Sequence, residues 1–271
     1  MIDTIHIVIS DTHSGSNHAL FIGRNWQGIQ NTHYPTSAQI EIRKHLLRYA
    51  AEVAHARKGK RIRLVVNGDA IDGDHHNSGD VCTINEKEQS DIHIEIMIEF
   101  QKLIKWQRGD ELYYTKGTQS HVHHQEDYIG EQMGAVANGD YYSWDFLKLE
   151  TNGVLSWFVH HGAGAGHGAN EGNNVRNWLK NICYDALKDG ERQPDIVYTG
   201  HTHDPTYSTF ISRNGMKFYT MHGIGLPSWQ AKTTYAWMKA PVQRNKIGGV
   251  IHEIKADGVI CIPRFCIMGY E

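Results

Sequence analysis

The sequence predicts an α/β fold, a four-layer sandwich in which two mixed β-sheets face each other between flanking helices. In the first half of the chain, β-rich runs alternate with long helical patterns, which is typical of parallel strands joined by crossover helices. In the second half, β-rich runs follow one another across two-residue turn signals, which indicates antiparallel hairpins. The chain has no internal repeat and no Ser/Pro-rich linker, so we expect one domain over residues 1–271.

The first half contains three short β-rich runs, each of which runs directly into a polar loop. Between them, two amphipathic patterns begin at capping residues and end near glycines. In the first pattern, the expected apolar stripe consists of Ile40, Leu46, Leu47, Ala50, Val53 and Ala54. The expected elements are strands 4–10, 61–67 and 111–115, a helix from Thr36 or Ser37 to Gly59, and a helix over about 85–107.

The second half is expected to be mostly antiparallel. Its turn signals are Asn152-Gly153, Asn214-Gly215 and Asp257-Gly258. One helix is expected over about 173–187, followed by a strand over 195–199 that leads into a polar Gly-His loop.

Composition limits the classes of function. The net charge is -3 with histidine neutral, so no global positive field attracts nucleic acid, and any such contact must be local. The 19 histidines are an excess, and imidazole is both the commonest metal ligand and the natural acid or base near neutral pH. A metal-binding or acid-base function is therefore favoured.

The chain shows neither a signal-peptide pattern nor an apolar run of membrane-spanning length. Its four cysteines form no CxxC pair, so we expect buried, reduced thiols. We therefore expect a cytoplasmic protein without a membrane partner. The sequence makes no prediction of oligomeric state.

Polar clusters follow five of the expected strands. Strand ends that share one sheet edge meet in space, and residues two apart just past a strand can reach the same cation. Carboxylates mixed with neutral imidazoles suit Mn, Fe(II), Zn or Co better than Ca or Mg alone. There are more candidate ligands than one ion can use, so two ions that share a carboxylate are expected. The clusters are Asp11-x-His13, Gly68-Asp69, 117–121, His160-His161-Gly162 and Gly200-His201-x-His203.

All of these clusters except 117–121 resemble, in their order along the chain, motifs of the calcineurin-like metallophosphoesterase family. In the second of them, the resemblance extends from Gly68-Asp69 to Asp72. The resemblance covers residues 11 to 203. It implies two divalent metal ions, with manganese favoured and zinc, iron or nickel as alternatives. It implies that one ion is surrounded by Asp11, His13, Asp69 and His203, and that Asp69 bridges to a second ion held by His201 and by His160 or His161.

The third motif departs from the family pattern. The family has Gly-Asn-His-Asp/Glu, in which the Asn is a ligand and the His is the catalytic acid, whereas this chain has Gly117-Thr118-Gln119-Ser120-His121. Thr118 stands at the Asn position. We expect His121 either to replace the Asn as a ligand or to act as the general acid, with His123 as the second candidate. Thr118 and Arg176 are assigned to substrate binding, and Arg24 is a further candidate to hold a phosphate.

The resemblance implies phosphoester hydrolysis by attack of a metal-bound hydroxide. We assign catalysis to Asp69 and, as our own hypothesis for the altered third motif, to His121. A phosphodiester substrate is favoured because few Lys or Arg residues lie near the motifs to hold a dianionic monoester. The alternatives are a nuclease acting on DNA or RNA, a phosphomonoesterase or protein phosphatase, and a non-catalytic scaffold with a degenerate site. The expected partner is a phosphoester, with a nucleotide or a nucleic acid among the options.

Overall fold

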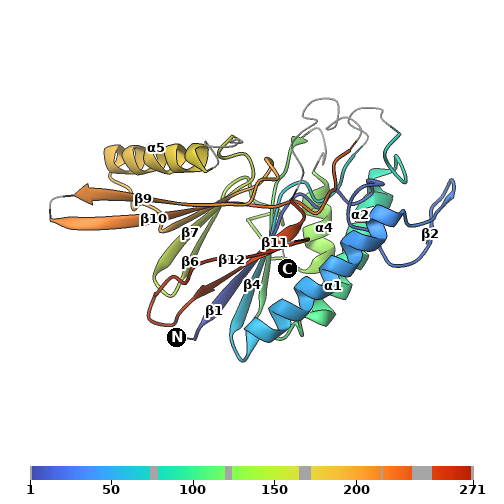
Figure 1. The fold of residues 1–271 in the computed structure, drawn as a ribbon, viewed down its shortest axis with the longest axis horizontal. Coiled ribbons are helices and arrows are strands. Elements are labelled where there is room, and N and C mark those ends of the chain that lie inside the picture. The colour runs from blue at the N-terminus through green and yellow to red at the C-terminus, as the bar shows by residue number, and fades with distance from the viewer. Residues whose placement is uncertain are drawn as a thin grey trace.

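Two five-stranded β-sheets face each other at the centre of the molecule, and helices lie on their outer sides (Figure 1). The protein is described by a computed structural model, which covers residues 2–73, 79–119, 124–164, 172–214, 216–233 and 246–269. The predicted α/β sandwich of two mixed sheets flanked by helices is confirmed.

The first sheet has the strand order β12-β11-β1-β4-β5. The three strands predicted from the first half pair in parallel, and two strands from the C-terminal part add to one edge in antiparallel pairing. Every residue of β1 is buried, as expected for a strand covered on both faces. The strands are β1 (Thr4–Ile9), β4 (Arg61–Asn67), β5 (Glu111–Thr115), β11 (Gly248–Ile254) and β12 (Arg264–Ile267). A separate two-stranded ribbon is formed by β2 (Trp26–Gln27) and β3 (Thr32–His33).

The second sheet has the order β6-β7-β8-β10-β9, with a parallel centre and an antiparallel hairpin at each edge. Its strands are β6 (Leu147–Thr151), β7 (Val154–Val159), β8 (Ile196–Thr199), β9 (Thr206–Asn214) and β10 (Lys217–Gly225). Asn152 and Gly153 both have positive φ, 52° and 82°, as a type I′ hairpin turn requires. The β9–β10 hairpin also forms where it is expected, although Gly215 lies outside the described residues.

Each sheet has helices on its outer face. The first is flanked by α1 (Ser37–Arg57), α2 (Glu86–Leu103) and α4 (Gln125–Met133), and α5 (Asn173–Asp189) lies over β9 and β10 (Figure 1). Thr36 caps α1 in a capping box with Gln39, and Asn85 caps α2.

The apolar stripe predicted for α1 is partly wrong. Leu46, Ala50 and Val53 are buried as predicted, whereas Ile40 and Leu47 are 45% and 39% exposed. The buried face also carries Tyr49, which stacks on Phe100 and whose hydroxyl donates to the carbonyl of Val250 at 2.9 Å.

One apolar layer lies between the sheets and joins them. Both sheets contribute fully buried side chains to it, among them Val8, Val65, Phe158 and Tyr198. This layer places the carboxyl ends of the parallel strands of both sheets beside each other. None of the helices described in the structure is long and apolar enough to cross a membrane. All four cysteines are free, and Cys82 and Cys183 are buried as expected, whereas Cys261 and Cys266 are only partly buried.

Candidate metal centre

Loops from both sheets meet at the carboxyl ends of the parallel strands. The backbone N–H of Asp11, after β1, donates to Gly68 after β4 at 3.1 Å, and that of His13 donates to Asp69 at 2.9 Å. In the second sheet, Gly200 donates to the carbonyl of His160 at 3.1 Å. Backbone hydrogen bonds therefore fix the strand-end loops before any ligand binds.

The seven predicted metal ligands form one cluster of overlapping groups. Within each group, one candidate ligand atom per residue lies within 4.8 Å of every other. The groups are Asp11 with His13 and His203; Asp11 with Asp69, His160 and His201; and His160 with His161 and His201. The structure thus brings together all seven side chains. Their roles as ligands remain predictions.

Asp11 lies at the floor of the cluster and is fully buried. Its Oδ1 is 3.0 Å from Nε2 of His160 and 3.3 Å from Nε2 of His203. The backbone N–H of His201 and the hydroxyl of Ser10 also donate to this carboxylate. Burial by itself raises the pKa of Asp11, but His160 and His203 outweigh burial and hold that pKa well below its usual range.

Asp69 lies between the two sides of the cluster. Its Oδ2 is 3.6 Å from Nε2 of His160 and 3.9 Å from Nε2 of His13. Thr118 donates its backbone N–H to Oδ1 at 2.6 Å and its hydroxyl to Oδ2 at 3.2 Å. One oxygen of Asp69 therefore faces a histidine from each of the two sheets.

His13 is oriented by a second carboxylate. Its Nδ1 lies 3.0 Å from Oδ1 of Asp72, which also accepts a hydrogen bond from the side chain of Gln230 at 2.9 Å. Burial opposes charge on the imidazole, but Asp72, Asp69 and Asp11 outweigh it and raise the pKa of His13 to about 9. With Nδ1 facing Asp72, Nε2 is directed toward Asp69, which is how an outer carboxylate orients a metal-ligating histidine.

Three imidazoles from two loops gather on the other side of Asp69. The ring centroids of His161 and His201 are 4.3 Å apart, and those of His160 and His161 are 4.7 Å apart. His160 is buried, whereas His161 is exposed. Burial and the neighbouring imidazoles lower the pKa of His201 to about 4, and burial and His160 also lower the pKa of His161. Both rings are therefore neutral near pH 7 and can offer a lone pair to a cation.

The backbone of the cluster is strained. Five of the seven predicted ligands have a positive φ, which side chains with a Cβ rarely adopt and which is concentrated at functional sites. Gly68 at φ 77° has a packing role as well, since a Cβ there would lie 2.4 Å from the ring of His160. The five ligands are Asp11 (53°), His13 (43°), Asp69 (47°), His201 (67°) and His203 (54°).

These donors fit divalent transition metals. Two buried carboxylates among neutral imidazoles form the mixed oxygen and nitrogen set that Mn, Fe, Co and Zn accept. Nδ1 of His160 is buried and has no hydrogen-bond partner among the described residues. Without a cation, Asp11 and Asp69 raise the pKa of His160 against the effect of burial and so favour protons on this ring. A bound cation would replace such protons.

The remaining predicted site residues differ in their placement. Thr118 contacts both Asp69 and His161. Arg176 is exposed on α5, and its proposed contact with substrate remains a prediction. His121 and His123 lie within 120–123, outside the described residues.

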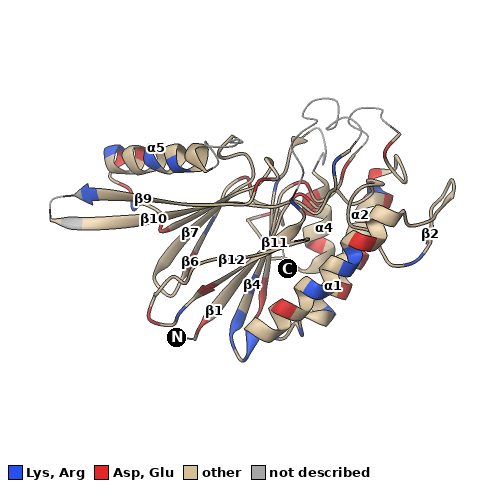
Figure 2. Cartoon of the chain, viewed as in Figure 1, with Lys and Arg blue, Asp and Glu red and all other residues tan. Residues whose placement is uncertain are grey.

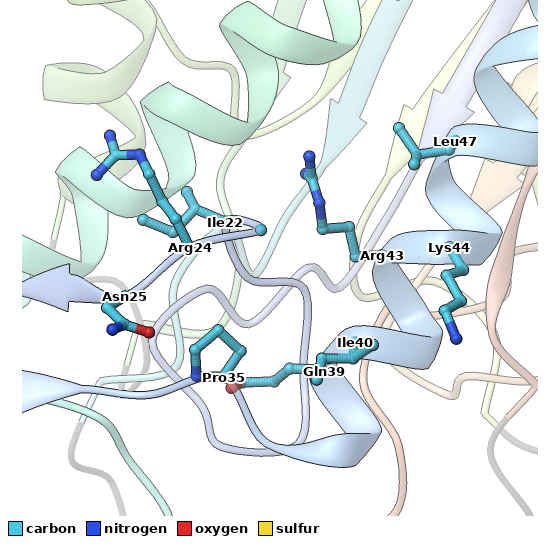
Figure 3. A pocket seen from close by; sticks show the side chains of 10 residues that line it. Ile22, Arg24, Asn25, Pro35, Gln39, Ile40, Arg43, Lys44 and Leu47 are labelled. Carbon is cyan, nitrogen blue, oxygen red and sulfur yellow. The ribbon is translucent and has the colours of Figure 1, made fainter.

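Arg24 is placed elsewhere. It lines a pocket of about 260 Å³ between α1 and the segment before it, and none of the clustered ligands lines this pocket (Figure 3). Each cation in the pocket is paired with a carboxylate: Arg24 with Glu95, Arg43 with Glu99 and Lys44 with Glu41, all at 2.7 Å. The prediction that Arg24 holds a phosphate at the metal centre is therefore not supported.

Glu126 is a buried residue near the cluster that the sequence reading missed. Its Oε1 accepts the backbone N–H of Gly117 at 3.2 Å, and burial together with Asp69 raises its pKa to about 8. It supports the loop that carries Thr118. Helix α4, which carries it, was also missed, although acidic residues in the first turn and Gly134 at the end are usual helix signals.

Several solved structures resemble this chain at low identity. The NAD nucleotidase of Haemophilus influenzae is 10% identical over 97% of this chain and 49% of its own, with a TM-score of 0.41. The 5′-nucleotidase precursor of Thermus thermophilus is 10% identical over 97% and 54%, with a TM-score of 0.37. A metallophosphoesterase is also among them. That protein, from Sphaerobacter thermophilus, is 10% identical over 98% of this chain and 89% of its own, with a TM-score of 0.36.

This chain spans about half the length of the two nucleotidase structures. No protein-family model and no curated protein sequence matches it.

Proposed function

We propose that this protein is a calcineurin-like metallophosphoesterase that hydrolyses phosphodiesters with two divalent metal ions. The observation that carries the proposal is the gathering of two buried carboxylates and five histidines at the strand ends of both sheets. Within this cluster, Oδ2 of Asp69 is 3.9 Å from Nε2 of His13 and 3.6 Å from Nε2 of His160. Paired metal sites that share a ligand are typical of enzymes that cleave phosphoesters.

Following the family resemblance, the first ion is assigned to Asp11, His13, Asp69 and His203, and the second to Asp69, His160 and His201. In the structure, Asp11 falls in one ligand group with His13 and His203 and in another with Asp69, His160 and His201. When bound, the ions would lower the pKa of water and neutralise charge that develops on the phosphoryl oxygens. Manganese is our first choice, with zinc, iron or nickel as alternatives.

The chain holds these ligands in place. Asp72 orients His13, Thr118 holds both oxygens of Asp69, and the backbone N–H of His201 binds Asp11. Ligands fixed by such outer contacts need little rearrangement when substrate binds. His121 is proposed as the residue that protonates the leaving group, and Arg176 as a substrate contact.

Charge near the cluster favours a diester. Two cations close to the strand-end loops are paired with carboxylates: Lys116 with Asp145 at 3.1 Å, and Lys246 with Asp204 at 3.4 Å. A dianionic monoester calls for more unpaired positive charge than a monoanionic diester. Both α1 and α5 carry acidic as well as basic residues (Figure 2), so these helices offer no continuous basic surface for a nucleic-acid backbone. We therefore propose a small diester rather than a polymer as the substrate. A cytoplasmic location is a separate part of the proposal.

Hydrolysis of bis-p-nitrophenyl phosphate and p-nitrophenyl phosphate tests the proposal. The protein is treated with a chelator and then restored with Mn²⁺ or Zn²⁺. We expect chelation to abolish turnover, metal to restore it, and kcat/KM to be higher for the diester. Turnover that survives chelation would exclude a metal-dependent hydrolase, and a higher kcat/KM for the monoester would exclude the diester preference.

A further inference from the structure

A histidine of α2 lies behind the loops that carry three of the predicted metal ligands. His93 is fully buried and belongs to none of the ligand groups. Its Nδ1 lies 3.2 Å from the hydroxyl oxygens of Thr12 and Ser14, both in the loop after β1. Its Nε2 lies 3.2 Å from the hydroxyl oxygen of Tyr114 on β5. The imidazole therefore joins the loop after β1 to a strand that carries none of these ligands.

The protons of these contacts follow from the chemistry of the side chains. The hydroxyl of Thr12 has one proton, which it donates to the carbonyl of Ala70 at 2.8 Å. Its oxygen therefore accepts from Nδ1 of His93, and Nε2 of the same ring accepts from the hydroxyl of Tyr114. Burial lowers the pKa of His93 to about 3, so near pH 7 the neutral ring has one donor and one acceptor. A continuous chain of hydrogen bonds thus runs from β5 through His93 to the loop after β4.

This chain of hydrogen bonds ends beside the predicted ligands. Thr12 stands between Asp11 and His13, and the carbonyl that Thr12 binds belongs to the residue after Asp69. The three ligands have φ values of 53°, 43° and 47°, and such backbone persists only where surrounding contacts hold it. We infer that His93 is a positioning residue, which holds the loops after β1 and β4 in the geometry that metal binding requires. This inference rests on the proposed two-metal function.

His252 shows what a buried histidine with a structural role alone looks like. It is also fully buried, its Nδ1 lies 2.6 Å from the hydroxyl of Tyr198, and its Nε2 lies 2.7 Å from the carbonyl of Cys261. It belongs to none of the ligand groups. Loss of either histidine should lower the stability of the fold, but only loss of His93 should also weaken metal binding.

Metal titration of His93 variants tests the inference. Metal-free protein is titrated with Co²⁺, and the bound ions are followed by calorimetry and by the visible spectrum. We expect the wild type to bind two ions. His93→Leu should bind one of them at least about tenfold more weakly, with a changed visible spectrum. His93→Asn, whose amide takes the place of Nδ1, should restore most of the affinity, whereas His93→Gln, whose amide takes the place of Nε2, should not.

Thr12→Val breaks the same chain of hydrogen bonds from its other end. The substitution removes the hydroxyl with little change in side-chain size, so the inference can be tested even where His93→Leu does not fold. The loss of Co²⁺ affinity should be similar to that expected for His93→Leu.

His252→Leu is the matched control. It should lower the thermal unfolding temperature and bind both ions with wild-type affinity, and an affinity loss as large as that of His93→Leu would contradict the inference. Equal losses in His93→Asn and His93→Gln would contradict it as well. If the wild type binds two ions and hydrolyses diesters while His93→Leu and Thr12→Val keep wild-type affinity, this inference is wrong and the proposed function stands. If the wild type binds no divalent ion, both are wrong.

Discussion

Replacement of Asp69 by Asn should lower metal-dependent kcat/KM for a phosphodiester by more than about 100-fold. Loss of a residue that only hydrogen-bonds to a metal ligand costs up to about 100-fold, and loss of a ligand should cost more. Asp69 is buried, lies between His13 and His160, and is held by Thr118. An amide lacks the negative charge needed to bridge two cations. The measurement is hydrolysis of bis-p-nitrophenyl phosphate together with a count of bound metal, which should fall from two ions to at most one.

Asp185→Asn is the control for this experiment. Asp185 is exposed on α5 and belongs to none of the ligand groups. Its replacement should leave both turnover and metal content unchanged. An Asp69→Asn variant with wild-type turnover and two bound ions would contradict the bridging role.

Acidification from pH 6 to pH 5 should destabilise the metal-free protein by about 3 kcal/mol. Burial lowers the pKa of three fully buried histidines: His6 to well below its usual value, His93 to about 3 and His252 to about 4. Below pH 6.5 these histidines bind protons in the unfolded chain but stay neutral in the folded chain. For each such histidine, the free energy of unfolding falls by about 1.4 kcal/mol per pH unit. Glu126, with its pKa raised to about 8, stabilises the folded chain as the pH falls. Its contribution to the free energy of unfolding cancels that of one of the three histidines.

His13 does not change this slope. Its pKa is raised to about 9, so its contribution to stability is complete below pH 6.5 and is lost only as the pH rises toward 9. Urea unfolding of metal-free protein at pH 7, 6 and 5 measures the effect. A free energy of unfolding that is constant from pH 6 to pH 5 would show that these buried histidines do not control acid stability.

The buried histidines also show where the sequence was ambiguous. No motif in the sequence sets His6, His93 and His252 apart from the other histidines, and the structure places all three in the core with partners. Nδ1 of His252 lies 2.6 Å from the hydroxyl of Tyr198, and Nε2 of His6 lies 3.0 Å from the hydroxyl of Thr151. Such partners come from distant parts of the chain and leave no local pattern.

The strand-end clusters were predictable because each lies next to a strong β-rich run, and parallel strands end at a common edge. This local information is enough to bring together Asp11, Asp69 and His201, which are far apart in sequence. It is not enough to choose between His160 and His161. That choice depends on how the chain leaves β7, which the sequence does not specify.

The outer contacts of the site were less predictable. Asp72 was recognised as part of a motif, but its contact with His13 depends on the backbone turn after β4. Glu126 was missed because α4 is short and its apolar pattern is weak. Both residues act on a ligand or its loop from another part of the fold.

The most direct test of the proposed metal centre is anomalous scattering from crystals of the protein loaded with Zn²⁺ or Mn²⁺. We expect two peaks about 3.5 to 4 Å apart, one on each side of the Asp69 carboxylate. The first should lie beside His13 and His203, and the second beside His160 and His201. A single peak, or two peaks that do not share Asp69, would contradict a two-metal phosphoesterase site in this protein.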